Sequence, residues 1–333
     1  MGMQLSYTVI PGSIFAGLTC DFSIPCVNVV IMMLMVAAQL FAVLLALPGL
    51  LAEQLSPDVT CDEDSVKAAA SLAVQHINKH HKHGFKFKLQ EVQSSKYQQF
   101  SGGCHIDVNM KLVQTMCHFT NPKPLEECPL WRRDQRGGTA ACSVEFWVMW
   151  DIAKITKYDC TTRPERTNDE MQLICPSCPK LLPLNDPIGV RAVEQAVHRF
   201  NQKSREQSYF TLLEVARLTS WDVASIGNIT WLKFALVETM CPKEAKNTRT
   251  CTPRCPDRAH HVFCQTAYFN THNQVGELEC EIYPPRNLEP LLEGEAEPVC
   301  GPLFHQSPEA CVCKERLKKP ELSVHHICPF PLK

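Results

Sequence analysis

The sequence predicts an α+β protein made of two tandem copies of one domain, each with a single helix packed across a curved antiparallel sheet. Three observations carry this prediction: an internal repeat, a helical stripe at the start of each copy, and alternating segments behind each helix. At an offset of 123 residues, AVQHIN at 73–78 aligns with AVHRFN at 196–201, and LQEV at 89–92 aligns with LLEV at 212–215. Four cysteines per copy keep the same register, so a duplication is indicated. They are Cys117, Cys128, Cys142 and Cys160, and then Cys241, Cys251, Cys264 and Cys280.

Each copy starts with a helical pattern. Apolar residues recur at helical spacing between Val66 and Ile77, and Gly84 ends this pattern. The same spacing recurs between Val190 and Phe200. Alternating, strand-like segments follow each helix. They cover residues 85–92, 105–113 and 143–150 in the first copy, and 209–215 and 229–237 in the second.

Composition excludes several classes of function. The 333 residues carry 33 Lys and Arg against 35 Asp and Glu, and a net charge of -2 provides no basic field for nucleic acid. The sequence has no G-x-S-x-G, H-E-x-x-H or P-loop pattern. We therefore expect a binding protein, not an enzyme, with no cofactor and no metal site.

The amino-terminal region predicts export. Residues 27–52 are apolar apart from Asn28 and Gln39, and we interpret residues 1–52 as an extension plus a cleaved signal peptide, with Met32 or Met33 as an alternative start. A signal anchor is the alternative, and it places the rest of the chain in the same oxidising space. No membrane contact is expected after cleavage.

The 19 cysteines are consistent with either disulfides or zinc. Only Cys175 and Cys178 have a C-x-x-C spacing, Cys251 and Cys255 have C-x-x-x-C, and no second pair stands at finger spacing in either copy. Disulfides are therefore favoured.

One helix, a sheet and two nested disulfides per copy resemble the cystatin fold. Two copies joined through CPSCP at 175–179, with a lone Cys61 before the first helix and a lone Cys328 near the end, resemble the fetuins, a family of secreted plasma glycoproteins. CPKLLPLND from residue 178 is similar to one branch of that family and YDCTTRP from residue 158 to the other. The resemblance implies cystatin-like domains at 61–174 and 180–283, a linker at 175–179, and an extended tail at 284–333 tethered by Cys328.

The fetuin pattern also implies a disulfide framework. Its pairs are Cys61–Cys328, Cys117–Cys128, Cys142–Cys160, Cys175–Cys178, Cys241–Cys251 and Cys264–Cys280. Five further cysteines have no partner in that pattern, namely Cys104, Cys255, Cys300, Cys311 and Cys313. An odd remainder predicts a free or intermolecular thiol.

Inhibitory cystatins block papain-like proteases with a wedge, formed by a Q-x-V-x-G hairpin tip and a Pro-Trp in the second hairpin. The resemblance places the first tip at Gln99, Phe100, Ser101, Gly102 and Gly103, and the second at Trp150. Ser101 replaces the Val and Met149 replaces the Pro, so an inherited turn with a merely packed Trp150 is the alternative. The second copy has no Gln at its tip and no Trp between Cys264 and Cys280.

The linker is a second candidate site, made of Cys175, Pro176, Ser177, Cys178 and Pro179. Fetuin-B-type inhibitors have CPDCP there, and its Asp is presented to the catalytic zinc of astacin-like metalloproteases. A neutral Ser177 hydroxyl is a poorer zinc ligand than a carboxylate. A clasp that sets the angle between the domains is the structural alternative.

Three weaker features complete the sequence evidence. The strand at 105–117 has Asp107 as its only acid, which gives little support to the calcium phosphate binding that the fetuin resemblance implies. His76 and His80 have the spacing of a metal pair, although a solvated cationic helix end explains them equally. Asn228 is the only N-x-[ST] site and is expected to carry a glycan.

We therefore expect a secreted, extracellular fetuin-type glycoprotein of plasma with endopeptidase inhibitor activity. Its expected partner is an extracellular protease of the papain-like or astacin-like class. The alternative is a carrier that binds mineral, regulates calcium phosphate deposition and inhibits nothing.

Overall fold

A computed structural model describes residues 59–150, 152–245, 247–289, 298 and 322–331. The predicted signal peptide within 1–52 and most of the predicted tail, with Cys300, Cys311 and Cys313, lie outside these residues. Within the described part, none of the helices has the length and apolar character that crossing a membrane requires.

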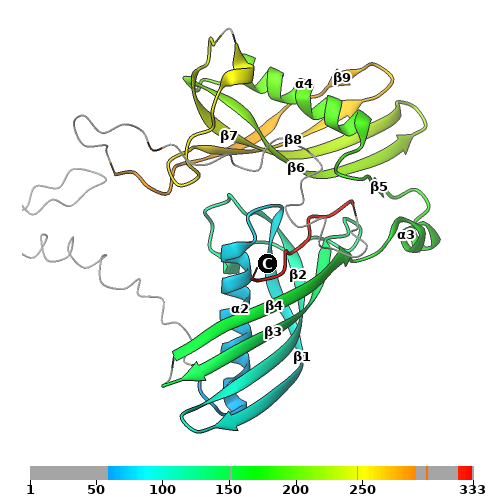
Figure 1. Ribbon diagram of the computed structural model, residues 1–333. Coiled ribbons are helices and arrows are strands. Elements are labelled where there is room, and N and C mark those ends of the chain that lie inside the picture. Colours follow the sequence, from blue (N-terminus) through cyan, green and yellow to red (C-terminus); the bar gives the residue numbers. More distant parts are fainter. Residues whose placement is uncertain (1–58, 151, 246, 290–297, 299–321, 332–333) are drawn as a thin grey trace, which may run out of the picture. The chain divides into compact units, whose positions relative to one another are not determined.

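The first domain consists of a helix, α2 (Val66–His80), and a four-stranded antiparallel sheet (Figure 1). The strands β1 (Phe85–Phe100), β2 (Gly103–His118), β3 (Gly138–Met149) and β4 (Ile152–Pro164) are hydrogen-bonded in sequence order. Short 3-10 turns lie at η2 (Glu63–Ser65) and η3 (Leu125–Glu127). Asp62 caps the start of η2, since its side chain accepts a hydrogen bond from the Ser65 N–H. The α+β prediction is confirmed here.

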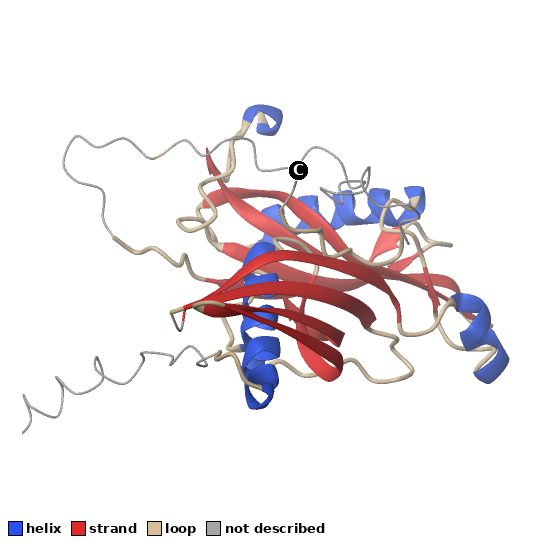
Figure 2. Ribbon diagram, turned by 60° about the horizontal axis from the view of Figure 1, so that its bottom comes forward, coloured by secondary structure: helices blue, strands red, loops and turns tan. Residues whose placement is uncertain are grey.

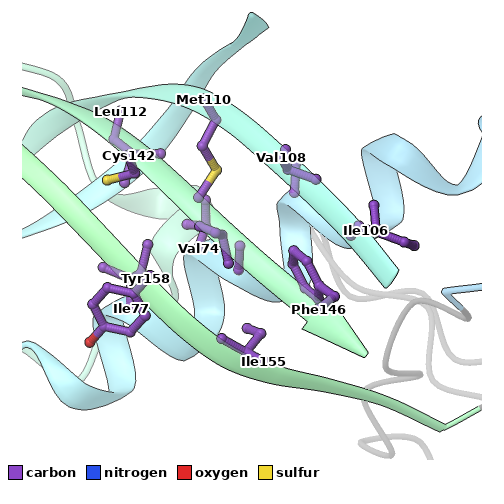
Figure 3. Close-up of a cluster of buried hydrophobic side chains, with 14 of the residues drawn as sticks. Val74, Ile77, Ile106, Val108, Met110, Leu112, Cys142, Phe146, Ile155 and Tyr158 are labelled. Atoms are coloured by element: carbon purple, nitrogen blue, oxygen red, sulfur yellow. The ribbon is translucent and has the colours of Figure 1, made fainter. Parts of the chain in front are cut away.

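Small side chains let α2 lie close against its sheet. Ala69, Ala70 and Ala73 are fully buried, together with Val74 and Ile77. Alternate residues of β2 and β3 meet this helical stripe, as Figure 3 shows for Ile106, Val108, Met110, Leu112 and Phe146. Each of these strand side chains is 0% exposed. The core thus uses one face of the sheet and leaves the opposite face, called here the open face, to the odd-numbered residues of β2 and β3.

The second domain repeats this plan with changes at its edge. Helix α4 (Pro187–Lys203) lies across a sheet of order β10-β8-β7-β6-β5, and Figure 2 shows both helices lying across strands. The elements are β5 (Lys180–Leu181), β6 (Ser208–Val223), β7 (Gly227–Pro242), η4 (Thr248–Thr250), β8 (His261–Phe269), β9 (Gln274–Val275) and β10 (Glu279–Tyr283). Gly189 permits the close approach of α4, because a Cβ there would lie 2.5 Å from Leu218 Cδ1.

An asparagine at the end of each repeated helical motif forms the same clip to the first long strand. The Asn78 amide donates to the carbonyls of Val74 and Phe87 and accepts from the Phe87 N–H at 2.8 Å. Asn201 makes the matching bonds to Val197 and Phe210, also with a 2.8 Å bond from the Phe210 N–H. The repeated motif found in the sequence therefore encodes a specific helix-to-strand bond.

Between the two domains lies a helix that the sequence analysis did not predict, α3 (Asn168–Ile174). It starts with a capping box. The Glu170 N–H donates to the Thr167 hydroxyl oxygen, and the Thr167 N–H donates to the Glu170 carboxylate. Asn168 then bonds both backbone groups of Leu181, at 2.9 and 2.8 Å, so the linker between α3 and β5 is held at both ends.

Disulfides follow the expected framework at five pairs and depart from it at one. The structure contains Cys117–Cys128, Cys142–Cys160, Cys175–Cys178, Cys241–Cys251 and Cys264–Cys280. The sixth pair differs from the expected Cys61–Cys328. Cys61 is instead bonded to Cys104, with 5.7 Å between their Cα atoms. Cys104 is fully buried on the helix-facing side of β2, where the chain ahead of the helix passes. Cys255 and Cys328 are also disulfide-bonded.

Removing the asparagine clip is expected to destabilise the fold. Asn201→Ala leaves the buried Phe210 N–H and C=O without these partners, so the free energy of unfolding should fall by about 2 kcal/mol. Gln202→Ala, at an exposed position one residue along α4, should change it by less than about 0.5 kcal/mol. Equilibrium denaturation in urea measures both, and equal effects of the two substitutions would contradict the role of the clip.

Candidate functional site: the hairpin tips of the first domain

The register of the first sheet brings two hairpin tips to the same end. Phe100 pairs with Gly103 at the end of the β1–β2 hairpin, and Met149 pairs with Ile152 at the end of the β3–β4 hairpin. Gly103 also pairs with Met149 across the central strands. The two turns are therefore neighbours, and the sheet places the predicted residues 99–103 and Trp150 together.

Two glycines of the first tip have separate structural reasons. Gly102 has a φ of 91°, a left-handed conformation that glycine adopts without a Cβ penalty. Gly103 has no such φ, but a Cβ on it would lie 2.1 Å from the carbonyl oxygen of Val148. Gly102 thus makes the turn, while Gly103 lets the second hairpin approach the first.

Trp150 lies in a conformation that costs stability. Its φ is 51°, in the left-handed region that is unfavourable for a bulky side chain, and its side chain is 80% exposed. The expectation that Trp150 packs against the fold is therefore not met by the structure. A strained backbone that displays an exposed indole is typical of a position kept for binding.

Apolar side chains surround the two tips. Phe100 is 41% exposed, Met149 43% and Ile152 72%. On the open face Trp147 is 50% exposed, and its ring lies 5.9 Å from that of Phe100. We call Phe100, Trp147, Met149, Trp150 and Ile152 the apolar tip. Such a cluster on the surface of a folded domain indicates an interaction site.

The chain ahead of α2 is fixed at the same end. The Cys61–Cys104 bond ties this segment to the residue that follows Gly103, and the Gln99 side chain donates to the Cys61 carbonyl at 3.4 Å. A disulfide that closes a loop of this length contributes about 4 kcal/mol in the chain-entropy model. Three chain segments thus converge at the apolar tip, and the tether was missed because Cys104 has no counterpart in the fetuin pattern.

The linker presents a small exposed loop. Pro176 and Ser177 are exposed between the bonded Cys175 and Cys178, and the Cys178 N–H donates to the Cys175 carbonyl at 3.1 Å. Arg136, 2% exposed, holds the far end through the Pro179 carbonyl and also bonds Asn168. Two apolar residues that the sequence analysis missed, Leu173 and Ile174, lie beside the loop and are 88% and 61% exposed.

The tip of the second domain is built differently. Gly227 has a φ of 87°, as Gly102 does, but the preceding turn carries Ala224, Ser225 and Ile226. Asn228, the predicted glycan site, is half-buried and donates to Ser220 at 2.8 Å and to Asp222. Glycosylation at Asn228 stays a prediction.

Neither an acidic array nor a metal site stands out among the described residues. On the open face of the first sheet Glu145 is paired with Lys157 at 2.7 Å, and this contact raises the pKa of Lys157. No group of three or more His, Cys, Asp or Glu in the described part of the chain is arranged to hold a metal ion. His80 bonds the His76 carbonyl, and burial lowers the pKa of His76 to about 4. Calcium phosphate binding stays a prediction that this face does not favour.

Comparison with known proteins identifies the family. The cystatin domain matches residues 56–146 and 177–273, more than half of the chain. The chain is 26% identical to antihemorrhagic factor BJ46a of Bothrops jararaca over 67% of this chain and 65% of that protein. It is 28% identical to alpha-2-HS-glycoprotein of Oryctolagus cuniculus over 69% of this chain and 63% of that protein. The matches thus span slightly less than two thirds of these relatives.

Solved structures give the same fold. Mouse fetuin-B superposes with a TM-score of 0.53 at 22% identity, covering 69% of this chain and 71% of that one. Mouse fetuin-B in complex with crayfish astacin gives 0.50 at 20% identity, covering 69% and 70%. Its inhibitory complex with human meprin beta gives 0.51 at 20% identity, covering 74% and 83%.

The chain therefore belongs to the cystatin family. Within that family it is a fetuin-type protein with tandem cystatin domains. Members of this family are protease inhibitors and not enzymes.

Trp150 is expected to cost the fold stability. Trp150→Asn replaces a bulky residue with one that tolerates the left-handed region, so the free energy of unfolding should rise by about 0.5–1 kcal/mol. Trp147→Asn should lower it, because that ring packs against Phe100 and His105. Urea denaturation distinguishes the two. A loss of stability in Trp150→Asn would show that Trp150 is a packing residue.

Proposed function

We propose that this chain is a secreted endopeptidase inhibitor that occludes a protease cleft with the apolar tip of its first domain. The observation that carries the proposal is the 80% exposed Trp150, held at a positive φ among four other exposed apolar side chains. Interfaces draw most of their binding energy from aromatic anchors of this kind.

The geometry suits inhibition better than cleavage of the tip as a substrate. The first tip is closed by the two-residue turn Ser101–Gly102, and the strands of both hairpins are paired to their ends, at Phe100 with Gly103 and at Met149 with Ile152. The disulfide at Cys104 restrains the base of the first tip. A preorganised, hydrogen-bonded turn loses little entropy on binding and does not offer the extended backbone that a protease cleaves.

The papain-like class is the first target to test. The two hairpin ends and the segment at Cys61 meet at one end of the sheet, and the apolar residues there are suited to binding in a groove. The fetuin-B complexes with crayfish astacin and human meprin beta support a protease as partner in this family. For this chain the identity of the protease is part of the proposal.

Secretion is proposed on the disulfides. Among the described residues fourteen cysteines are disulfide-bonded, a density that is stable in an oxidising compartment. The prediction of a plasma glycoprotein rests on the same point and on the relationship to alpha-2-HS-glycoprotein.

The apolar tip is tested by inhibition of papain. We expect the full chain from a secreting cell line to inhibit at micromolar concentration or better. Trp150→Ala should raise the inhibition constant at least about tenfold, as loss of an aromatic anchor typically does. Trp221→Ala, which removes a 41% exposed indole near the tip of the second domain, should change it by less than about twofold.

Two results would contradict the proposal. One is an inhibition constant that Trp150→Ala leaves unchanged. The other is no inhibition of papain by the unmodified chain at micromolar concentration together with delayed calcium phosphate precipitation, which would favour the carrier alternative.

The linker is tested separately with an astacin-type protease. Ser177 is exposed at the apex of the disulfide loop, so Ser177→Asp places a carboxylate where a catalytic zinc can be reached. We expect this substitution to strengthen inhibition of crayfish astacin at least about tenfold and Ser177→Ala to leave it unchanged. If Ser177→Asp has no effect, the linker does not enter the cleft.

A further inference from the structure

A largely buried carboxylate of the second domain is surrounded by histidines from three parts of the chain. Glu214 on β6 accepts a hydrogen bond from His118 Nε2 on β2 at 2.6 Å and from the Gly84 N–H at 2.6 Å. His325 Nε2 lies 3.9 Å from its second oxygen. His83 contributes to the same electrostatic environment. We call Glu214, His83, His118 and His325 the histidine cluster.

A segment near the carboxyl terminus joins both domains at this cluster. We call residues 322–330 the strap. His325 donates to the Val215 carbonyl on β6 at 2.8 Å, and His83 donates to the His326 carbonyl at 2.6 Å. Phe330 forms an antiparallel bridge with Tyr158 on β4. The strap thus bonds the first domain on one side and the second on the other.

Aromatic packing keeps the cluster dry. The His118 ring stacks on Phe263 of β8 at 5.1 Å, and Phe85 of β1 meets the same Phe263 edge-on at 5.8 Å. His118 is 0% exposed, while His83 and His325 are each 6% exposed. An added charge on these rings would therefore lack water.

The hydrogen bonds already assign His118 to a neutral form. Its Nε2–H donates to Glu214, and its Nδ1 accepts from the Thr120 hydroxyl at 2.7 Å and faces the Thr120 N–H at 3.4 Å. A proton on Nδ1 would oppose that N–H. His81, 3% exposed, has no hydrogen-bond partner for either ring nitrogen among the described residues. Neither ring is prepared to hold a second proton.

Cations outnumber carboxylates around the cluster. Glu214 is its one carboxylate among the described residues, since Glu238 lies in a separate pair with His260 and Arg254. The other charged or titratable groups that interact with the cluster are His81, Lys86, His261 and His326.

Burial lowers the pKa of His81, His83 and His118, that of His83 to about 4. Burial alone would raise the pKa of the Glu214 carboxyl, but His325, the hydrogen bond from His118 and the nearby His83 together lower it to about 2. Glu214 therefore stays ionised in the range where the histidines titrate, and it opposes their pKa depression without reversing it.

We propose that the histidine cluster and the strap form a pH-sensitive clasp, which holds the two domains together at neutral pH and releases them on mild acidification. Opening exposes the rings of His81, His83 and His118 to water, where each can bind a proton. Closing requires those protons to leave. The clasp does not depend on the proposed inhibition. Its release would let the orientation of the two domains on either side of the linker at residues 175–179 change.

The direction of the effect follows from the depressed histidine pKa values. Below about pH 6.5 the open form binds more protons than the closed form, at His81, His83 and His118. For each proton that only the open form binds, the ratio of open to closed form rises about tenfold for each pH unit below about pH 6.5. The clasp is complete above about pH 6.5 and weakens as the pH falls.

Hydrogen exchange of the full chain, measured by mass spectrometry at pH 7.5 and 5.0 and corrected for intrinsic rates, tests this clasp. Peptides that contain Gly84 and the strap should lose at least about tenfold of their protection at pH 5.0. Peptides from the centre of β2 and β3 should keep theirs, which distinguishes release from unfolding. Unchanged protection of the strap would overturn the proposal.

Substitutions assign the effect to the cluster. The triple variant His81→Gln, His83→Gln, His118→Gln should keep its protection at pH 5.0, because the three rings whose pKa burial lowers are then absent. His198→Gln, an exposed position on α4, should open as the unmodified chain does. A triple variant that opens like the unmodified chain would contradict the clasp.

Glu214→Gln provides a second measurement if the triple variant does not fold. The carboxylate favours protonated rings inside the closed form, so its loss should move the midpoint of opening to higher pH. A midpoint that stays or moves to lower pH would overturn the proposal.

Discussion

The hydrogen-bond register between β2 and β3 is the constraint on which the candidate site depends. Gly103 faces Met149 across these strands, and this one pairing places both hairpin turns at the same end of the sheet. A shift by a single residue would move every side chain of one strand to the opposite face. It would bury Trp147 against α2 and expose Phe146. The register is held by the fully buried residues of β2 and β3 and by the Cys142–Cys160 bond at the next pair of strands.

The two domains keep the same scaffold and differ where they meet solvent. Asn78 and Asn201 make the same bonds, and Gly102 and Gly227 make the same kind of turn. The first domain then carries Trp150 and a disulfide at Cys104, whereas the second carries Ile226 and Asn228 at its tip. The duplication thus preserved the bonds that fold the domain while the tips diverged. This division agrees with a binding surface on one domain only.

The sequence was sufficient for the fold because its signals are local. Helical spacing, strand alternation and the repeat locate α2, α4 and the first parts of β1 and β6, and they fall within β2, β3 and β7, whereas no segment was predicted for β4 or β8. The sequence could not reveal the Cys61–Cys104 bond. This bond forms because the segment ahead of α2 runs past the end of the sheet that carries the two hairpin tips, and no local pattern encodes that path. Likewise, the exposure of Trp150 depends on a turn conformation that no residue pattern encodes, and the bonds of His118 to Glu214 join residues far apart in the chain. Helix α3 was detectable, since Thr167 and Glu170 have the spacing of a capping box.

The central claim is that the apolar tip enters a protease cleft. Hydroxyl-radical footprinting of the full chain, alone and with equimolar inactive papain, tests it most directly, because Met149 and Trp150 are exposed and carry readily oxidised side chains. The account predicts that oxidation of Met149 and Trp150 falls several-fold in the mixture while oxidation of Trp221 in the second domain does not change. Unchanged oxidation of Met149 and Trp150, or an equal fall at Trp221, would contradict it.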